Sequence, residues 1–234
     1  MLRAAIDIML LLIVAYCTWM GSKKGIIGGV AGILAIIVSL YVGSLLSSAF
    51  SGEIIPAFRP FAGGIIESKE SAVIEEMGYS GLSLEDIVAA NPEEGLNYGI
   101  NIYEALGIHP KRADDMAQKA MELAESEKIV LSAAVEDTLC KNVLYVGGTV
   151  FGAILVLILL TVIANLFNLR FHIPNSPKLD FYGGMGLGLL NGTAYCILIC
   201  WILSFFGMFL GDVLSQSLLT RFYLLFDFLT GAIL

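Results

Sequence analysis

Few residues of this chain have the types and spacing that catalysis or metal binding requires. The two histidines, His109 and His172, are separated by a predicted membrane crossing, and neither has cysteines or paired carboxylates at ligand spacing. The motifs Gly-x-Ser-x-Gly and His-Glu-x-x-His and a phosphate-binding glycine loop are absent. Cys196 and Cys200 share a predicted helix face at i and i+4, a spacing that could bind a metal or react, but free cysteines in an apolar helix act as small packing groups. We therefore expect no enzyme activity, no cofactor and no bound metal.

Asp7 is the candidate intramembrane polar site, because it precedes the charge-free residues 8–22 within an apolar segment. A charge at the centre of a bilayer costs about 2.5 to 3.5 kcal/mol even on the milder insertion scales. One interpretation is an interfacial carboxylate that reaches water or interacts with the first amides of its helix. The other is a proton or cation site that faces the interior of a helix bundle.

The elements that must position Asp7 are apolar helices. Of the 234 residues, 57% are hydrophobic and only 15% are charged, which is typical of a membrane protein. Charged residues are absent from four stretches, 8–22, 25–52, 142–169 and 181–211. A transmembrane helix needs about 20 mostly apolar residues, and the first stretch reaches that length only as 4–21. A signal peptide is the competing interpretation of this first stretch, but Asp7 interrupts it and residues 16–20 lack a small-residue cleavage pattern.

We predict an all-α integral membrane protein with four transmembrane helices, an extramembrane helical insertion and an interfacial C-terminal helix. The predicted segments are 1–51 with helices one and two, 52–141 as the insertion, 142–211 with helices three and four, and 212–234 as an amphipathic C-terminal helix. The C-terminal segment has an apolar, aromatic face and a narrow polar stripe, which favours the membrane interface. A fifth crossing is the alternative, although Asp212, Arg221 and Asp227 would interrupt it.

The insertion is strongly acidic. It carries 17 acidic and 7 basic residues and has a net charge of −10, whereas the rest of the chain has a net charge of +2. This acidity indicates either a solvated outer surface or a site for a cationic ligand or basic partner, and nucleic-acid binding is not expected. Ser83 begins a capping-box pattern, Gly78 and Gly107 are predicted helix ends, and a helix after Pro110 is expected to run toward the third crossing.

The positions of lysine and arginine predict the orientation in the membrane. The first short loop, residues 21–25, contains two lysines, and the third, residues 169–180, contains Arg170 and Lys178. Because short basic loops stay in the cytoplasm, we expect both loops inside and the termini and the acidic insertion outside the cell membrane.

Small residues recur at helical spacing within the predicted crossings. Glycines four residues apart let helix backbones approach closely in lipid, within one chain or between copies in a homo-oligomer. Flexibility of helix four, or a path along it, is the alternative for its glycines. Asp180, just before residue 181, is the predicted N-cap of helix four. The predicted packing glycines are Gly28, Gly32, Gly148, Gly152, Gly184, Gly188 and Gly192.

Several short motifs resemble the colicin V production (CvpA) family. They are Ile6-Asp7-Ile8, then residues 21–25 (Gly-Ser-Lys-Lys-Gly) leading into a glycine- and alanine-rich helix, and the glycine-rich run 179–192. The pattern covers residues 4–50 and 142–229. The insertion is longer than in short members of the family, and Asn191 stands where an arginine would resemble them more closely.

The resemblance implies a bacterial inner-membrane protein, linked to toxin production or export and to envelope homeostasis, with no established reaction. We expect a non-enzymatic accessory or scaffold factor in the lipid bilayer, with an envelope or secretion partner bound through the insertion. The alternative is an oligomeric channel or transporter for a small solute or ion, in which Asp7 and the glycines of helix four would take part.

Overall fold

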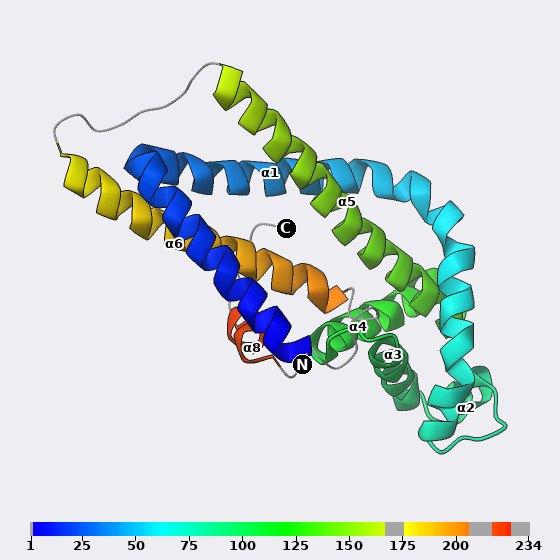
Figure 1. The fold of residues 1–234 in the computed structure, drawn as a ribbon. Coiled ribbons are helices and arrows are strands. Elements are labelled where there is room, and N and C mark those ends of the chain that lie inside the picture. The colour runs from blue at the N-terminus through cyan, green and yellow to red at the C-terminus, as the bar shows by residue number, and fades with distance from the viewer. Residues whose placement is uncertain (1, 167–175, 206–216, 226–234) are drawn as a thin grey trace. The chain divides into compact units, whose positions relative to one another are not determined.

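A computed structural model describes residues 2–166, 176–205 and 217–225, and every regular element in these ranges is helical (Figure 1). The elements, in chain order, are α1 Leu2–Glu76, α2 Leu84–Ala90, α3 Glu93–Ala105, α4 Pro110–Glu127, α5 Leu131–Leu166, α6 Pro177–Phe205 and α8 Leu218–Leu224.

Three of these helices contain segments that are long and apolar enough to cross a membrane. The segments are Ala4–Phe50, Leu131–Ala164 and Pro177–Phe205, and they support a multi-pass membrane protein. The first segment is broken at Gly25, whose φ of 71° and ψ of −175° lie outside the helical region. The predicted loop at residues 21–25 is therefore wrong in extent, because residues 21–24 are helical and Gly25 alone makes the break.

The helices do not begin and end where the charge-free stretches do. Helix α1 continues beyond residue 51 to Glu76, and α5 begins at Leu131, ahead of the uncharged stretch. The helix that was expected to run from Pro110 toward the third crossing is also interrupted: α4 ends at Glu127, Lys128 adopts a left-handed conformation with φ of 53°, and α5 begins separately at Leu131. The ends of the helices therefore do not follow the distribution of charge along the chain.

The chain forms two compact units. The first, called the membrane unit here, comprises Met1–Ser47, Gly147–Leu203 and Val213–Leu234. One of its buried clusters joins Ile6 and Leu10 of α1 to Cys196 and Cys200 of α6 and Tyr223 of α8. A second cluster joins Ile36 and Leu40 of α1 to Ala153 of α5.

The second unit, called the helical unit here, comprises Ser48–Val146 and Ser204–Asp212. Its core is centred on Tyr98 and Tyr103 of α3, both fully buried. The Tyr103 hydroxyl donates to the Val135 carbonyl at 2.9 Å, and the Tyr98 hydroxyl donates to Glu70 at 3.1 Å. Burial raises the pKa of both tyrosines, so they remain neutral donors that tie α3 to α5 and α1.

Local signals predicted four helix boundaries in the helical unit. Ser83 is the N-cap of α2, and its hydroxyl accepts from the Asp86 amide at 3.2 Å. Gly78 and Gly107 adopt positive φ after α1 and α3, the backbone conformation that glycine adopts without strain. Pro110 begins α4, where its missing amide proton costs no hydrogen bond.

The C-terminal prediction is described only in part. Residues 218–224 form α8, and the Ser217 hydroxyl accepts from the Thr220 amide at 3.1 Å as its N-cap. The rest of the predicted segment 212–234 lies outside the described residues, as do Arg170 and His172 of the predicted third loop.

Candidate functional site

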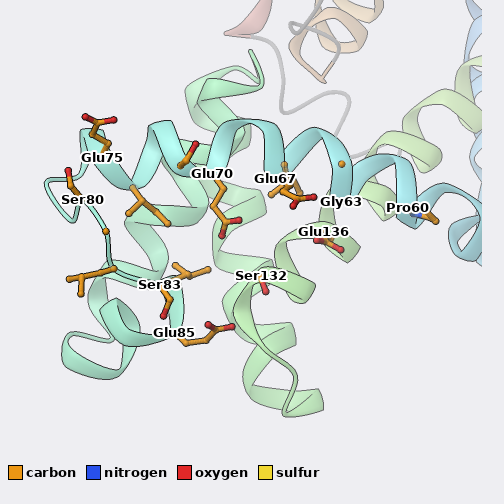
Figure 2. Close-up of a pocket in the computed structure, with 17 residues that line it drawn as sticks. Pro60, Gly63, Glu67, Glu70, Glu75, Ser80, Ser83, Glu85, Ser132 and Glu136 are labelled. Atoms are coloured by element: carbon orange, nitrogen blue, oxygen red, sulfur yellow. The ribbon is translucent and has the colours of Figure 1, made fainter.

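The helical unit contains an open groove of about 1170 Å³ (Figure 2). Its walls come from α1, from the turn at residues 80–83, from α2 and from the first turns of α5. Five carboxylates line it, and no lysine or arginine appears among its described lining residues. The carboxylates belong to Glu67, Glu70, Glu75, Glu85 and Glu136.

Apolar side chains give the groove a second kind of surface. Ile66 and Ile74 of α1, which are buried, line it together with Leu82 and Leu84. Leu82 is 50% exposed although it is large and apolar. The groove therefore offers both negative charge and apolar contact, the combination that an amphipathic cationic segment would match.

A neighbouring ion pair leaves the groove carboxylates without a basic partner. The Arg59 guanidinium binds both oxygens of Asp137, with its Nε 2.6 Å from Oδ1 and its Nη2 2.7 Å from Oδ2. Asp137 is buried and does not line the groove. Because the bidentate geometry fixes the guanidinium on Asp137, Arg59 is the ion-pair partner of Asp137, the residue next to Glu136.

The carboxylates are spread along the groove and do not converge on one point. Figure 2 shows them on three different helices, and no group of three or more His, Cys, Asp or Glu residues in the described ranges could hold a metal ion. A single small cation would need converging ligands. An extended ligand with several positive charges matches this arrangement better.

Asp7 lies within the membrane unit, where it holds the start of α8. Its Oδ1 accepts from the Ser217 hydroxyl at 2.7 Å and from the Leu219 amide at 3.2 Å. Ser217 and Thr220 are fully buried beside it. The amide in these contacts belongs to α8 and not to the helix that contains Asp7.

Asp180 caps a helix other than the one predicted. Helix α6 begins at Pro177, so Asp180 lies inside its first turn and is not its N-cap. Its Oδ1 accepts from the Ile26 amide at 2.8 Å, which begins the part of α1 that follows the break at Gly25. A Cβ at Gly25 would collide with the Asp180 carboxylate. Asp180 and Gly25 together make the tight junction between α1 and α6.

The predicted glycines of α6 lie against the backbone of α1. A Cβ at Gly184 would lie 2.8 Å from the Gly25 Cα, one at Gly188 would lie 3.0 Å from the Thr18 Cα, and one at Gly192 would lie 2.9 Å from the Val14 Cα. Such approaches are closer than any side chain allows.

The glycines of α5 and of the second part of α1 have different neighbours. Cβ atoms at Gly148 and Gly152 would meet Ser47 and Gly43 of α1, and one at Gly32 would lie 3.0 Å from Asn191 Nδ2. That nitrogen donates to the Gly29 carbonyl at 3.0 Å. At Gly28, by contrast, the neighbouring atoms within 4 Å of an added Cβ belong to the Lys24 side chain of the same helix.

Three further glycines at these contacts were missed by the sequence analysis. Gly21 lies against Gly184 and Gly188, Gly29 against Leu187, and Gly43 against the backbone of Thr149 and Ala153. Gly21 and Gly29 each lie four residues from Gly25, a spacing that could have identified them, whereas Gly43 has no glycine four residues away. Of the cysteines, Cys196 and Cys200 are fully buried, and the Cys196 thiol lies 3.5 Å from the Leu10 carbonyl as a weak donor.

The groove could not be predicted from the sequence, in which the net negative charge of the insertion was the related signal.

Comparison with known proteins gives no assignment: no family model matches the sequence, and no curated protein or solved structure is significantly similar to it.

Proposed function

We propose that this chain is a membrane-anchored, non-enzymatic accessory or scaffold factor that uses the acidic groove to hold a basic segment of a partner protein. The groove carries the proposal, because it combines five carboxylates with an apolar wall and has no basic residue among its described lining. The resemblance to the colicin V production family supports a bacterial inner-membrane location and a partner from toxin export or envelope maintenance.

The proposed anchor has four membrane crossings. Ala4–Phe50 contains 47 residues, which at about 1.5 Å per residue would extend about 70 Å, more than twice the thickness of a bilayer core. The break at Gly25 divides this length into two crossings, and α5 and α6 supply the other two. The acidic insertion then lies outside the cytoplasm, as the basic residues at 23, 24 and 178 favour.

The alternative of an oligomeric channel or transporter relies on Asp7 and on the glycines of α6. Asp7 accepts hydrogen bonds from the start of α8, and Gly184, Gly188 and Gly192 lie against the backbone of α1. Because both features have packing roles in the membrane unit, we favour the scaffold.

A photo-reactive amino acid at Leu82 tests the proposal in living cells. We expect ultraviolet light to link this position to one defined protein through a basic segment, which mass spectrometry of the linked peptides identifies. Val130 is a matched control, because it is 51% exposed, belongs to the same unit and lies outside the groove. Equal linking from both positions would contradict a groove-specific partner.

Charge variants make the same test more specific. Replacing Glu67, Glu75 and Glu85 by glutamine should lower the yield of the linked product about tenfold, because electrostatic attraction raises association by 10-fold or more. A control removes three exposed carboxylates of the helical unit outside the groove, namely Glu76, Glu122 and Glu125. An unchanged yield in the groove variant, or an equal loss in the control, would overturn the proposal.

A further inference from the structure

The membrane unit has a basic rim at the junction between α1 and α6. Lys23 and Lys24 immediately precede the break at Gly25, and Lys178 lies in the first turn of α6. The hydrogen bond from the Ile26 amide to Asp180 joins these two segments, and Figure 1 shows the bend of α1 beside the first turns of α6. All three lysines are exposed, and none forms an ion pair with a carboxylate in the described part of the chain.

Exposed aromatic side chains accompany these lysines. Lys23 Nζ lies 3.6 Å from the centre of the Trp19 ring, and Trp19 is 54% exposed. On α6, Phe181 and Tyr182 pack edge to face at 5.3 Å and are 48% and 63% exposed. Tryptophan and tyrosine gather at the level of lipid headgroups, where lysine side chains extend toward the phosphates.

We propose that this basic rim, defined by Lys23, Lys24 and Lys178, binds the headgroups of anionic phospholipids. The phosphate of the lipid meets the ammonium groups, and its acyl chains lie along the exposed apolar flanks at Ile27 and Leu179, which are 40% and 61% exposed. These flanks favour a lipid over free phosphate. The inference rests on the membrane insertion in the proposed function and is independent of the groove and its partner.

The number of lysines in the basic rim sets the expected change in the preference for anionic lipid. Each basic residue near an anionic membrane surface strengthens binding about fivefold, so removal of three lysines should weaken the preference for anionic lipid by up to about 100-fold. The attraction should also weaken at high salt, because exposed charges are screened beyond about 3 Å at 1 M ionic strength.

The experiment compares lipid enrichment around the full chain in nanodiscs of phosphatidylcholine that contain about one-fifth phosphatidylglycerol. Native mass spectrometry of released protein measures the phosphatidylglycerol that remains bound. We expect enrichment for the wild type and its loss in K23Q/K24Q/K178Q. The control K69Q/K119Q/K128Q removes three exposed lysines of the helical unit and should keep the enrichment.

Additional variants and conditions distinguish lipid binding from unfolding and from binding of free phosphate. The charge-conserving variant K23R/K24R/K178R should retain the enrichment, and circular dichroism establishes that each variant is folded. If the glutamine variant is unfolded, loss of wild-type enrichment at 1 M NaCl is the supporting result. Enrichment that persists in the folded glutamine variant overturns the proposal, and so does displacement of the lipid by inorganic phosphate, which would indicate a free-phosphate site. The groove proposal is unaffected by either result, because its test does not involve these lysines.

Discussion

Gly188→Ala is expected to destabilise the membrane unit strongly, whereas Gly186→Ala on the same helix should have little effect. An added Cβ at Gly188 would collide with the Cys17 carbonyl and would lie 3.0 Å from the Gly21 Cα. These are backbone atoms, so no side-chain rotation can relieve the collision and the two helices must move apart. At Gly186 nothing lies within 4 Å of an added Cβ.

Overpacking of a close contact costs about 1 to 3 kcal/mol, and separation of the helices would also remove the contacts at Gly184 and Gly192. We therefore expect Gly188→Ala to lose about 3 kcal/mol of stability. Gly186→Ala should be neutral or slightly stabilising, because alanine favours a helix by up to about 1 kcal/mol over glycine. Reversible unfolding in mixed detergent measures the free energy of unfolding of both variants and of the wild type. Similar values for the two variants would show that the helices are not in backbone contact at Gly188.

Asp180→Leu is expected to be the second damaging substitution, because it removes the acceptor of the Ile26 amide. Asp180 is only 5% exposed, and water has little access to replace the lost hydrogen bond. An unpaired buried amide costs about 1 to 3 kcal/mol. Asp180→Asn retains an acceptor oxygen of similar position and should lose less.

Two measurements separate the role of Asp180 as a cap from a general packing role. The free energy of unfolding should be highest for the wild type, lower for Asp180→Asn and lowest for Asp180→Leu. Hydrogen exchange should show faster exchange of the Ile26 amide in Asp180→Leu, while amides of α5 in the same unit remain protected. Equal loss of stability in both variants, with unchanged exchange at Ile26, would be incompatible with capping of the second part of α1.

The glycines of α1 and α6 show what residue spacing can predict about helix packing and what it cannot. Their four-residue spacing in α6 indicates a face that allows close approach, because each turn of a helix returns to the same side. Spacing contains no information about which helix meets that face. Gly21, Gly25 and Gly29 follow the same four-residue spacing, but only the arrangement of α1 against α6 shows that Gly21 and Gly29 meet α6. Gly28, by contrast, lies against the Lys24 side chain of its own helix.

The polar residues show the same division. Asp180 has the residue type of a cap, but its acceptor function is used by an amide 154 positions away. Asp7 likewise reaches the start of α8, more than 200 positions along the chain. Local sequence can identify a residue able to cap a helix. It cannot identify a partner that only folding brings near.

The sequence by itself determined the helical, membrane-associated class, the acidity of the insertion and four helix boundaries within it, at Ser83, Gly78, Gly107 and Pro110. These features depend on composition and on interactions within a few residues. The tertiary structure alone decided the break at Gly25 against Asp180, the backbone contacts between α1 and α6, and the gathering of five carboxylates along one groove. Those features depend on contacts between distant segments, which the packing of whole helices creates.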